Sequence, residues 1–587
     1  MKQLMTGDEA IARGAWEAGV TVAAAYPGTP STEILENIGE FYTKDIYSEW
    51  APNEKVAAEV AIGASIAGAR SLCAMKHVGV NVAADPILSF AYSGVNGGFV
   101  LVTADDPTMH SSQNEQDNRT YAKFAKIAMI EPSDSQECVD FMKEAYRVSE
   151  EFNTSVLFRV TTRVCHSKSL VEVGERVAVE IKPYTRNVSK FVSIPAFARQ
   201  NRLVTEERLK KLEEYSNTSI LNKEELFEGS KIGIITAGIS YQYAKEVFGE
   251  KASYLKLGFT YPLPMDKIRN FAEKFETVYV IEELEPYMEE QIKAAGIKVI
   301  GKEVFPNIFE LNPAIIDKAI NGVVKEFKTP DVTAASRPPV LCAGCPHRGF
   351  FYTRSKKKNI IMTSDIGCYT LGGLMPIDTI DAVLCMGGGF SLAMGMSKAF
   401  EAYGEKRTVF GILGDSTFFH SGMTGALDIV YNKGRVVPVV LDNSITGMTG
   451  QQENPGTGKT LMGAEASQTD IIGILTSLGY ETIRVVDPCD LVAMEAAVDE
   501  AIVAVDNGVR FAIVTKRPCV LIKNSPPYKT KCKVITDKCK KCKVCLRVGC
   551  PAISFKDGAA FIDDSMCLGC EVCKQTCKFE AIVKVGE

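Results

Sequence analysis

Eight of the chain's 18 cysteines lie in two short runs near the C-terminus. Each run places three thiols within seven residues and a fourth thiol a few residues later. This spacing suits an iron–sulfur cubane that takes three ligands from one run and its fourth from the other. We therefore predict two [4Fe–4S] clusters. Their ligand sets are Cys539, Cys542, Cys545 and Cys577 for one, and Cys567, Cys570, Cys573 and Cys550 for the other.

Two other interpretations of these thiols are a zinc ribbon and a disulfide knot. Zinc sites usually use two separated cysteine pairs, and disulfide frameworks belong to short secreted chains. The runs instead resemble a bacterial two-cluster ferredoxin, with two departures. Four residues rather than three precede Cys550, and Lys578 stands where a proline is usual. We predict that the chain transfers electrons.

A second group of polar residues follows two apolar runs. Gly414 and Asp415 end the first run, and Asp442 and Asn443 end the second. Their spacing predicts one crossover helix between neighbouring parallel strands, so both ends would share one edge of a sheet. A carboxylate and an amide oxygen there suit a hard divalent cation that also binds phosphate oxygens. A helix opening at Ser416 would direct backbone N–H groups at a pyrophosphate.

This second group resembles the motif that binds thiamine diphosphate and Mg²⁺. Ser416 replaces the third residue of that motif and Asp442 replaces its first asparagine. A Gly-Asp pair at a strand end is also common in other α/β proteins, so the motif alone is only moderately specific.

The elements that must position these residues alternate between apolar strand-like runs and helical segments, which is typical of α/β layers. We expect α/β domains at 1–180, 231–330 and 335–525, a linker with one exposed helix at 181–230, and an α+β tail at 530–587.

Bulk properties indicate a globular protein. Of 587 residues, 46% are apolar. Neither a signal peptide nor a run of 18 apolar residues is evident, so we expect a cytoplasmic protein with no membrane or nucleic-acid partner. Residues 529–587 carry 12 Lys+Arg against 7 Asp+Glu, although the whole chain has a net charge of −6. These lysines either offset the charge of thiolate-ligated clusters or form a docking face for an acidic electron carrier.

Six further segments carry a resemblance that covers essentially the whole chain. They read YPGTPSTEI, NEKVAAEVAIGASIAGAR, CAGCPHRGFF, SDIGCYTLG, GDSTFFHSGM and LDNSITGMTG. Together they resemble the α (large) subunit of the indolepyruvate:ferredoxin oxidoreductases, within the 2-oxoacid:ferredoxin oxidoreductase superfamily. The resemblance implies two parallel α/β domains of the thiamine diphosphate type, at 1–180 and 335–525. It also implies a transketolase C-terminal-like domain at 231–330 and a ferredoxin-like tail.

The resemblance also implies roles for individual residues. Glu54 would hydrogen-bond the aminopyrimidine of thiamine diphosphate, favouring the imino tautomer that removes the C2 proton. Asp415, Asn443 and the carbonyl of Ile445 would bind Mg²⁺, and Gly414 and Ser416 would contact the cofactor. Thr29 and His77 would lie near the substrate; His347 and His420 share this motif context, and each histidine is equally consistent with a buried structural role. A third, proximal [4Fe–4S] cluster would use Cys342, Cys345, Cys368 and Cys519, although Asp365 departs from the usual small residue.

The function implied is oxidative decarboxylation of aryl 2-oxoacids with coenzyme A, giving an aryl-acetyl-CoA and CO2 and passing electrons to ferredoxin. A smaller β subunit in an α2β2 heterotetramer is part of the same expectation. The alternatives are a non-redox thiamine decarboxylase, an enzyme of this superfamily for another 2-oxoacid such as pyruvate, or a non-catalytic electron-transfer subunit with a vestigial thiamine fold.

Overall fold

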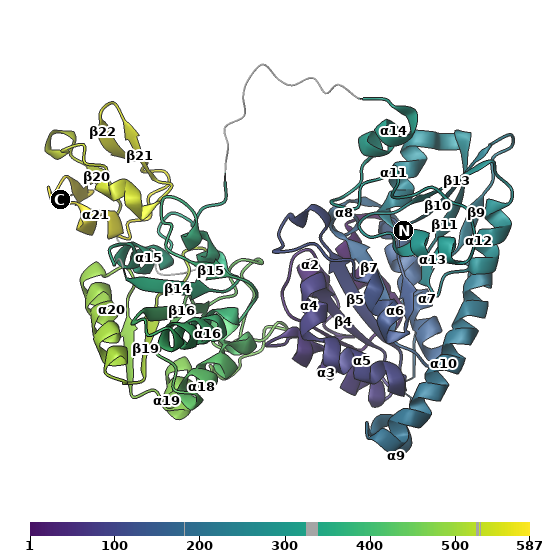
Figure 1. Cartoon of the computed structure of the whole chain (residues 1–587), viewed down its shortest axis with the longest axis horizontal. Coiled ribbons are helices and arrows are strands. Elements are labelled where there is room, and N and C mark those ends of the chain that lie inside the picture. Colours follow the sequence, from purple (N-terminus) through teal and green to yellow (C-terminus); the bar gives the residue numbers. More distant parts are fainter. Residues whose placement is uncertain (181, 325–337, 358, 524–527, 529, 587) are drawn as a thin grey trace. The chain divides into compact units, whose positions relative to one another are not determined.

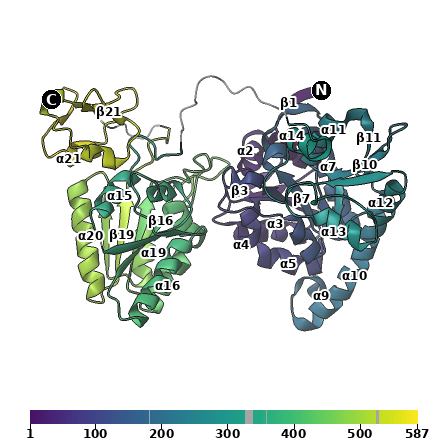
Figure 2. The ribbon, with the colours of Figure 1, turned by 45° about the horizontal axis from the view of Figure 1, so that its top comes forward.

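The computed structural model describes residues 1–180, 182–324, 338–357, 359–523, 528 and 530–586. The chain divides into two compact units, Met1–Asp331 and Val332–Glu587 (Figure 1 and Figure 2). Among the described residues, no helix combines the length and the apolarity needed to cross a membrane.

The first unit is built on a seven-stranded sheet with the strand order β12-β6-β7-β5-β4-β2-β3. Neighbouring strands are parallel except β12, which pairs antiparallel with β6. The strands are short apolar runs, and β4 and β5 are buried along their whole length, as expected where helices cover both faces of a parallel sheet. The strands are β2 (Val22–Ala25), β3 (Tyr47–Trp50), β4 (Ser71–Lys76), β5 (Phe99–Asp105), β6 (Ala128–Ile130), β7 (Val156–Thr161) and β12 (Phe259–Tyr261).

Helices join these strands and begin at clear capping residues. The side chain of Asn53 caps α3, and that of Asp134 caps α7, each by accepting a backbone N–H. α1 and α7 pack closely because Gly14 has no side chain; a Cβ there would lie 2.9 Å from Met142 Cβ. The helices are α1 (Gly7–Glu17), α2 (Thr32–Phe41), α3 (Glu54–Ile66), α4 (His77–Val82), α5 (Ala84–Ser93), α6 (Arg119–Ala125), α7 (Ser135–Glu151) and α8 (Thr162–His166).

A second, four-stranded sheet in the first unit has the order β13-β10-β11-β9. Its edge strand β9 (Lys223–Glu225) lies inside the interval that the sequence predicts to be a linker. That interval also holds α9 (Val188–Phe191) and the 24-residue α10 (Pro195–Thr218). α10 is not fully exposed, because Leu212 and Arg208 are buried. The other strands are β10 (Ile232–Ala237), β11 (Ala252–Leu257) and β13 (Thr277–Ile281), and the helices are α11 (Ile239–Phe248), α12 (Met265–Ala272), α13 (Tyr287–Ala294) and α14 (Pro313–Asn321).

The second unit contains a six-stranded, all-parallel sheet with the order β15-β14-β16-β17-β19-β18. One apolar core joins one face of the sheet to α15 and α20, and a second core joins the other face to α16, α18 and α19. The strands are β14 (Ile360–Ser364), β15 (Ala382–Val383), β16 (Thr408–Gly414), β17 (Val436–Asp442), β18 (Thr482–Val486) and β19 (Phe511–Lys516). The helices are α15 (His347–Ser355), α16 (Gly388–Ala402), α17 (Asp415–Thr417), α18 (Met423–Tyr431), α19 (Ile471–Leu478) and α20 (Leu491–Asp506).

The cysteine-rich tail packs on this second unit. It has two antiparallel strand pairs, β20 with β23 and β21 with β22. The fully buried Arg348 of α15 ties the tail to the larger domain by donating to the carbonyls of Val548 and Gly549, at 3.1 and 2.5 Å. The tail elements are β20 (Cys532–Val534), β21 (Ile553–Lys556), β22 (Ala559–Ile562), α21 (Val572–Thr576) and β23 (Ile582–Lys584).

Candidate active site and thiol clusters

Three oxygen atoms converge at the carboxyl edge of the six-stranded sheet. Asp415 follows β16 and Asn443 follows β17, and these strands are parallel neighbours, as the sequence predicts. The Asn443 side-chain oxygen lies 2.8 Å from the carbonyl oxygen of Ile445 and 3.1 Å from Asp415 Oδ1. Ligands about 2.1 Å from an octahedral Mg²⁺ lie roughly 3 Å apart. The donor set and its spacing therefore fit Mg²⁺.

Neighbouring groups hold this set in place. Asn454 Nδ2 donates to the second oxygen of Asp415 at 3.0 Å. The Asn443 amide nitrogen lies 3.5 Å from Nε2 of His347. Burial lowers the pKa of His347 to about 4, so this imidazole is neutral at pH 7 and can accept a hydrogen bond. With the amide reversed, the Asn443 nitrogen would instead donate to the Ile445 carbonyl at 2.8 Å and to Asp415 Oδ1 at 3.1 Å, so the amide oxygen suits this position when a cation lies between the three groups.

The electrostatics of Asp415 also favour a cation. Burial raises the pKa of Asp415 to about 7, and the nearby Asp442 carboxylate adds to that increase. A buried carboxylate is costly unless a positive charge compensates it. Asp415 and Ile445 line a pocket of about 640 Å³. At the start of the helical segment, Ser416 Oγ accepts a hydrogen bond from Thr446 Oγ1 at 2.9 Å.

Asp365, the departure noted in the sequence, has a structural role. Its oxygens accept hydrogen bonds from the Tyr369 hydroxyl at 2.5 Å and from the Gly387 N–H at 2.9 Å. The third motif histidine, His420, is buried, and its Nδ1 lies 2.9 Å from Ser421 Oγ.

The thiols predicted for a proximal cluster lie beside the oxygen site. The backbone N–H of Cys519 donates to the carbonyl of Asn443 at 2.9 Å. A Cβ on Gly447 would lie 3.5 Å from the Asn443 amide nitrogen and 3.7 Å from Cys368 Sγ. Burial raises the pKa of Cys368 to about 11, and nearby Cys519 and Cys342 raise it further. Burial also raises the pKa of Cys345, with contributions from Cys368 and Cys342. The structure thus brings all four thiols together.

In the first unit, Glu54 is the first residue of α3 and is 6% exposed. The backbone of α4 approaches its carboxyl closely: a Cβ on Gly79 would lie 2.9 Å from Glu54 Oε1. Only a glycine leaves room for a buried carboxyl at this position. The next acidic residue of α3, Glu59, is exposed and pairs with Lys55.

Thr29, Lys76 and His77 meet around one short segment of chain. Ser111 Oγ donates to the Thr29 carbonyl at 3.3 Å, and Lys76 Nζ donates to the Ser111 carbonyl at 2.6 Å. His77 Nε2 lies 3.2 Å from the carbonyl of Asn114, so this nitrogen carries the donor proton. Burial lowers the pKa of Lys76 to about 8, and Asp106 opposes that shift only partly. Burial and Lys76 lower the pKa of His77.

The tail forms two cavities, each lined by four of the predicted ligands. A backbone N–H points at a ligand sulfur in each: Ala581 N to Cys577 Sγ and Cys532 N to Cys567 Sγ, both at 3.4 Å. All of these cysteines are free thiols. The donor chemistry fits iron–sulfur clusters. The first cavity is lined by Cys539, Cys542, Cys545 and Cys577, and the second by Cys550, Cys567, Cys570 and Cys573.

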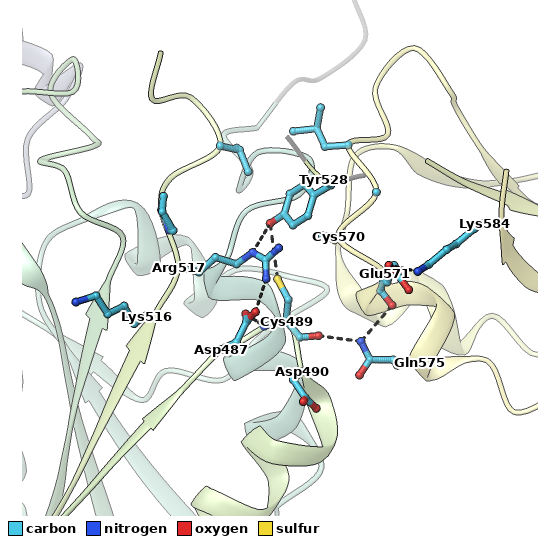
Figure 3. A pocket seen from close by; sticks show the side chains of 14 residues that line it. Asp487, Cys489, Asp490, Lys516, Arg517, Tyr528, Cys570, Glu571, Gln575 and Lys584 are labelled. Carbon is cyan, nitrogen blue, oxygen red and sulfur yellow. Dashed lines mark hydrogen bonds and ion pairs between the residues drawn. The ribbon is translucent and has the colours of Figure 1, made fainter. Parts of the chain in front are cut away.

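The second tail cavity adjoins the proximal thiols. It also shares Cys570 and Glu571 with an open pocket, whose lining side chains Figure 3 shows. Gly344, between Cys342 and Cys345, lines this cavity. In the pocket, the Tyr528 hydroxyl donates to the Gly344 carbonyl at 2.9 Å. Cys489 lies next to Cys570, and its thiol lowers the pKa of Cys570.

Comparison with known proteins identifies thiamine diphosphate-binding domains in the chain. Two family models match the chain: "Pyruvate flavodoxin/ferredoxin oxidoreductase, thiamine diP-bdg" over residues 13–208, and "Thiamine pyrophosphate enzyme, C-terminal TPP binding domain" over residues 365–515. The indolepyruvate oxidoreductase subunit IorA of Archaeoglobus fulgidus is 39% identical, covering 99% of this chain and 97% of its own. The IorA of Pyrococcus horikoshii is also 39% identical, covering 100% and 97%. The chain belongs to the IorA family.

Membership of the IorA family makes this chain a thiamine diphosphate-dependent 2-oxoacid oxidoreductase of the 2-oxoacid:ferredoxin oxidoreductase superfamily. Among solved structures, the 2-oxoglutarate:ferredoxin oxidoreductase from Magnetococcus marinus is 16% identical with a TM-score of 0.46, covering 55% of this chain and 65% of its own.

Sequence analysis of this IorA-family chain missed four residues that the structure places at these sites. For Lys76 the sequence does contain a signal, because a lysine ends the buried strand SLCAMK. The sequence contains no signal for the other three residues. Only the folded chain brings Asn454 to Asp415, and Cys489 and Cys532 to the second tail cavity.

Proposed function

We propose that this chain is the thiamine diphosphate-binding subunit of an oxidoreductase that decarboxylates aryl 2-oxoacids of the indolepyruvate type. The products are the aryl-acetyl-CoA and CO2, and the electrons pass to ferredoxin. One observation carries the proposal: the converging oxygens of Asp415, Asn443 and Ile445 lie directly beside the proximal thiols. This juxtaposition suits a decarboxylation coupled to one-electron carriers, which a non-redox decarboxylase would not need.

In this proposal, the second unit anchors the cofactor. Asp415, Asn443 and the carbonyl of Ile445 hold Mg²⁺, and through it the diphosphate. Asn454 and His347 orient two of these ligands. Gly414 and Ser416 begin the helical segment at the diphosphate. When bound, thiamine diphosphate supplies an electron sink for the carbon that loses CO2.

The residues of the first unit act on protons and on the substrate. Glu54 holds a proton at the aminopyrimidine ring nitrogen, a role that suits a carboxyl shielded from water. Lys76 supplies a positive charge for the carboxylate of the 2-oxoacid. His77 and Thr29, which share the Ser111–Asn114 segment with Lys76, border the same substrate.

The thiols hold three [4Fe–4S] clusters, which supply one-electron carriers. Their order in the second unit runs from the oxygen site to the proximal thiols, then to the second and first tail cavities. Lys540 and Lys543 line the first cavity, which supports docking of an acidic electron carrier such as ferredoxin. The relatives are named as a subunit, which supports the existence of a partner chain. We place this chain with a smaller partner subunit in an α2β2 assembly that also binds coenzyme A.

The test is anaerobic turnover of the chain purified with its partner subunit. Indolepyruvate, phenylpyruvate and pyruvate are supplied in turn with coenzyme A and a viologen dye. We expect aryl 2-oxoacids to reduce the dye fastest, and about twelve irons per chain, four for each cubane. Faster turnover of pyruvate would contradict the substrate class. Iron clusters without bound thiamine diphosphate or turnover would favour the non-catalytic electron-transfer subunit with a vestigial thiamine fold.

A further inference from the structure

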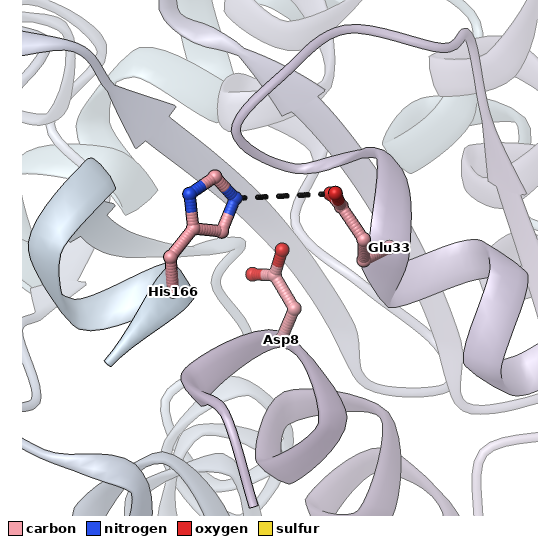
Figure 4. A group of neighbouring side chains, drawn as sticks. All are labelled: Asp8, Glu33 and His166. Carbon is pink, nitrogen blue, oxygen red and sulfur yellow. Dashed lines mark ion pairs between the residues drawn. The ribbon is translucent and has the colours of Figure 1, made fainter. Parts of the chain in front are cut away.

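Three ligand-type side chains meet in the first unit away from the residues discussed above (Figure 4). Asp8 belongs to the first turn of α1, Glu33 to the first turn of α2, and His166 ends α8. One ligand atom from each lies within 4.8 Å of those of the other two. Three helices that are far apart in sequence therefore direct two carboxylates and an imidazole at one point.

Asp8 makes this group unusual. Its side chain is fully buried, and neither of its carboxyl oxygens has a hydrogen-bond partner among the described residues. Glu33 Oε2 is buried and lacks a hydrogen-bond partner as well. Buried polar atoms are almost always paired, and an unpaired carboxylate is costly. The Asp8 carboxyl faces a second carboxyl and an imidazole, and neither of its oxygens accepts a hydrogen bond from the described residues. It therefore requires a compensating proton or cation.

The surroundings favour a cation. Ligand oxygens of Asp8 and Glu33 lie within 4.8 Å of each other, so the two carboxyls destabilise each other when both are ionised with no cation between them. The Cys165 thiol lies next to Asp8, but its sulfur is not among the ligand atoms that converge within 4.8 Å of one another. His166 Nε2 lies 3.9 Å from Glu33 Oε2, too long for a hydrogen bond. Two ligands of a tetrahedral zinc lie about 3.3–3.6 Å apart, so a small side-chain shift would let both bind one ion.

The geometry points to a Zn²⁺ site formed by Asp8, Glu33 and His166, which leaves the fourth position of the zinc to a water molecule. Zinc accepts nitrogen, oxygen and sulfur donors in a tetrahedral set. Magnesium and calcium prefer six or more oxygen ligands, which this group does not offer. The inference does not depend on the proposed function.

A metal bound at this site would cross-link α1, α2 and α8. α2 begins directly after the Thr29–Pro30 turn, and Glu33 is in its first turn. A metal that joins Glu33 to α1 and α8 would fix the start of α2, and with it the turn that carries Thr29. Metal binding to the folded state alone would stabilise the first unit.

The test uses the full chain, purified anaerobically with its iron–sulfur clusters so that cluster thiols are occupied. The protein is washed with EDTA, incubated with one equivalent of Zn²⁺, desalted and analysed by ICP-MS. We expect about one zinc per chain, lost in Asp8→Asn and in His166→Gln, with iron content unchanged in both. His110→Gln is the matched control, because His110 also pairs with a glutamate, Glu310, but faces no bare buried carboxylate. It should retain the zinc.

Two further measurements decide the outcome. Zinc K-edge EXAFS should show nitrogen and oxygen neighbours with no more than one sulfur, and zinc should raise the Tm of the wild type but not of either variant. Four sulfur neighbours would assign the zinc to cluster cysteines and overturn the inference. Absence of zinc in the wild type, with Asp8→Asn more stable than the wild type, would show that a shared proton resolves the Asp8–Glu33 contact instead.

Discussion

The two large parallel sheets end in different kinds of side chain at their carboxyl edges. In the six-stranded sheet of the second unit, oxygens of Asp415, Asn443 and Ile445 converge within about one Mg²⁺ coordination shell. In the seven-stranded sheet of the first unit, strand β4 ends in the buried cation Lys76, followed by the buried imidazole His77. Similar architecture therefore supports different chemistry, and the residues at each edge decide it. In the proposed function, the second edge anchors a cofactor, whereas the first handles protons and substrate.

The largest effect is expected from Asp415→Ala, which removes the one charged ligand of the oxygen site. Thiamine diphosphate should be lost completely on desalting, and with it all cofactor-dependent activity, while iron content stays unchanged. Thiochrome fluorescence measures the bound cofactor. Asp442→Asn, which removes a neighbouring charge but no proposed ligand, should retain the cofactor. Full occupancy in Asp415→Ala would mean that the second edge is not the anchor.

Glu54→Gln tests the first edge and should separate activation from binding. The glutamine keeps the size of the side chain but cannot supply a carboxyl proton, so the cofactor should stay bound. Exchange of its C2 proton for deuterium should slow by about 10²- to 10⁴-fold, the usual range for acid–base catalysis. Quench and NMR measure the exchange. The control is Glu59→Gln on the exposed side of α3, which should exchange at the wild-type rate. An unchanged exchange rate in Glu54→Gln would show that Glu54 does not activate the cofactor.

Sequence alone predicts more of the second edge than of the first. Parallel pairing of β16 with β17 follows from two buried apolar runs separated by one helix, and Gly-Asp and Asp-Asn mark their ends. The grouping of the tail thiols follows from their spacing. The site at Glu54 is harder to predict, because it depends on how closely the backbone at Gly79 approaches. Likewise β9, within the expected linker, becomes a strand only because β11 lies beside it.

Lys76→Met removes the buried charge of the first edge. A hydrogen bond to a charged group contributes about 1.5–3 kcal/mol, so KM for the 2-oxoacid should rise roughly tenfold to a hundredfold, with bound cofactor unchanged. The pKa of Lys76 is about 8. Its charge is present below that pH and is lost as the pH rises through it. kcat/KM of the wild type should therefore fall above about pH 8, whereas Lys76→Met should show a lower value without this step. Wild-type KM in the variant would exclude contact with the substrate.

The smallest effect is expected on the midpoint potential of the second tail cluster, which lies next to residues that follow the six-stranded sheet. Cys489, which follows β18, lies next to Cys570 and lowers the pKa of the Cys570 thiol. Its thiol can therefore donate a hydrogen bond to the Cys570 sulfur when that sulfur binds iron. A donor to a cluster ligand stabilises the reduced, more negative cluster, so Cys489→Ala should lower the midpoint potential of the second tail cluster. A hydrogen bond of about 1 kcal/mol corresponds to roughly 40 mV for a one-electron couple.

An anaerobic redox titration followed by EPR measures the shift. Cys385→Ala, which removes an exposed thiol of the same unit, is the control and should leave all potentials unchanged. One tail signal should move and the other should not. If neither moves, the Cys489 thiol does not act on the cluster, and the influence of the second edge ends at the proximal thiols.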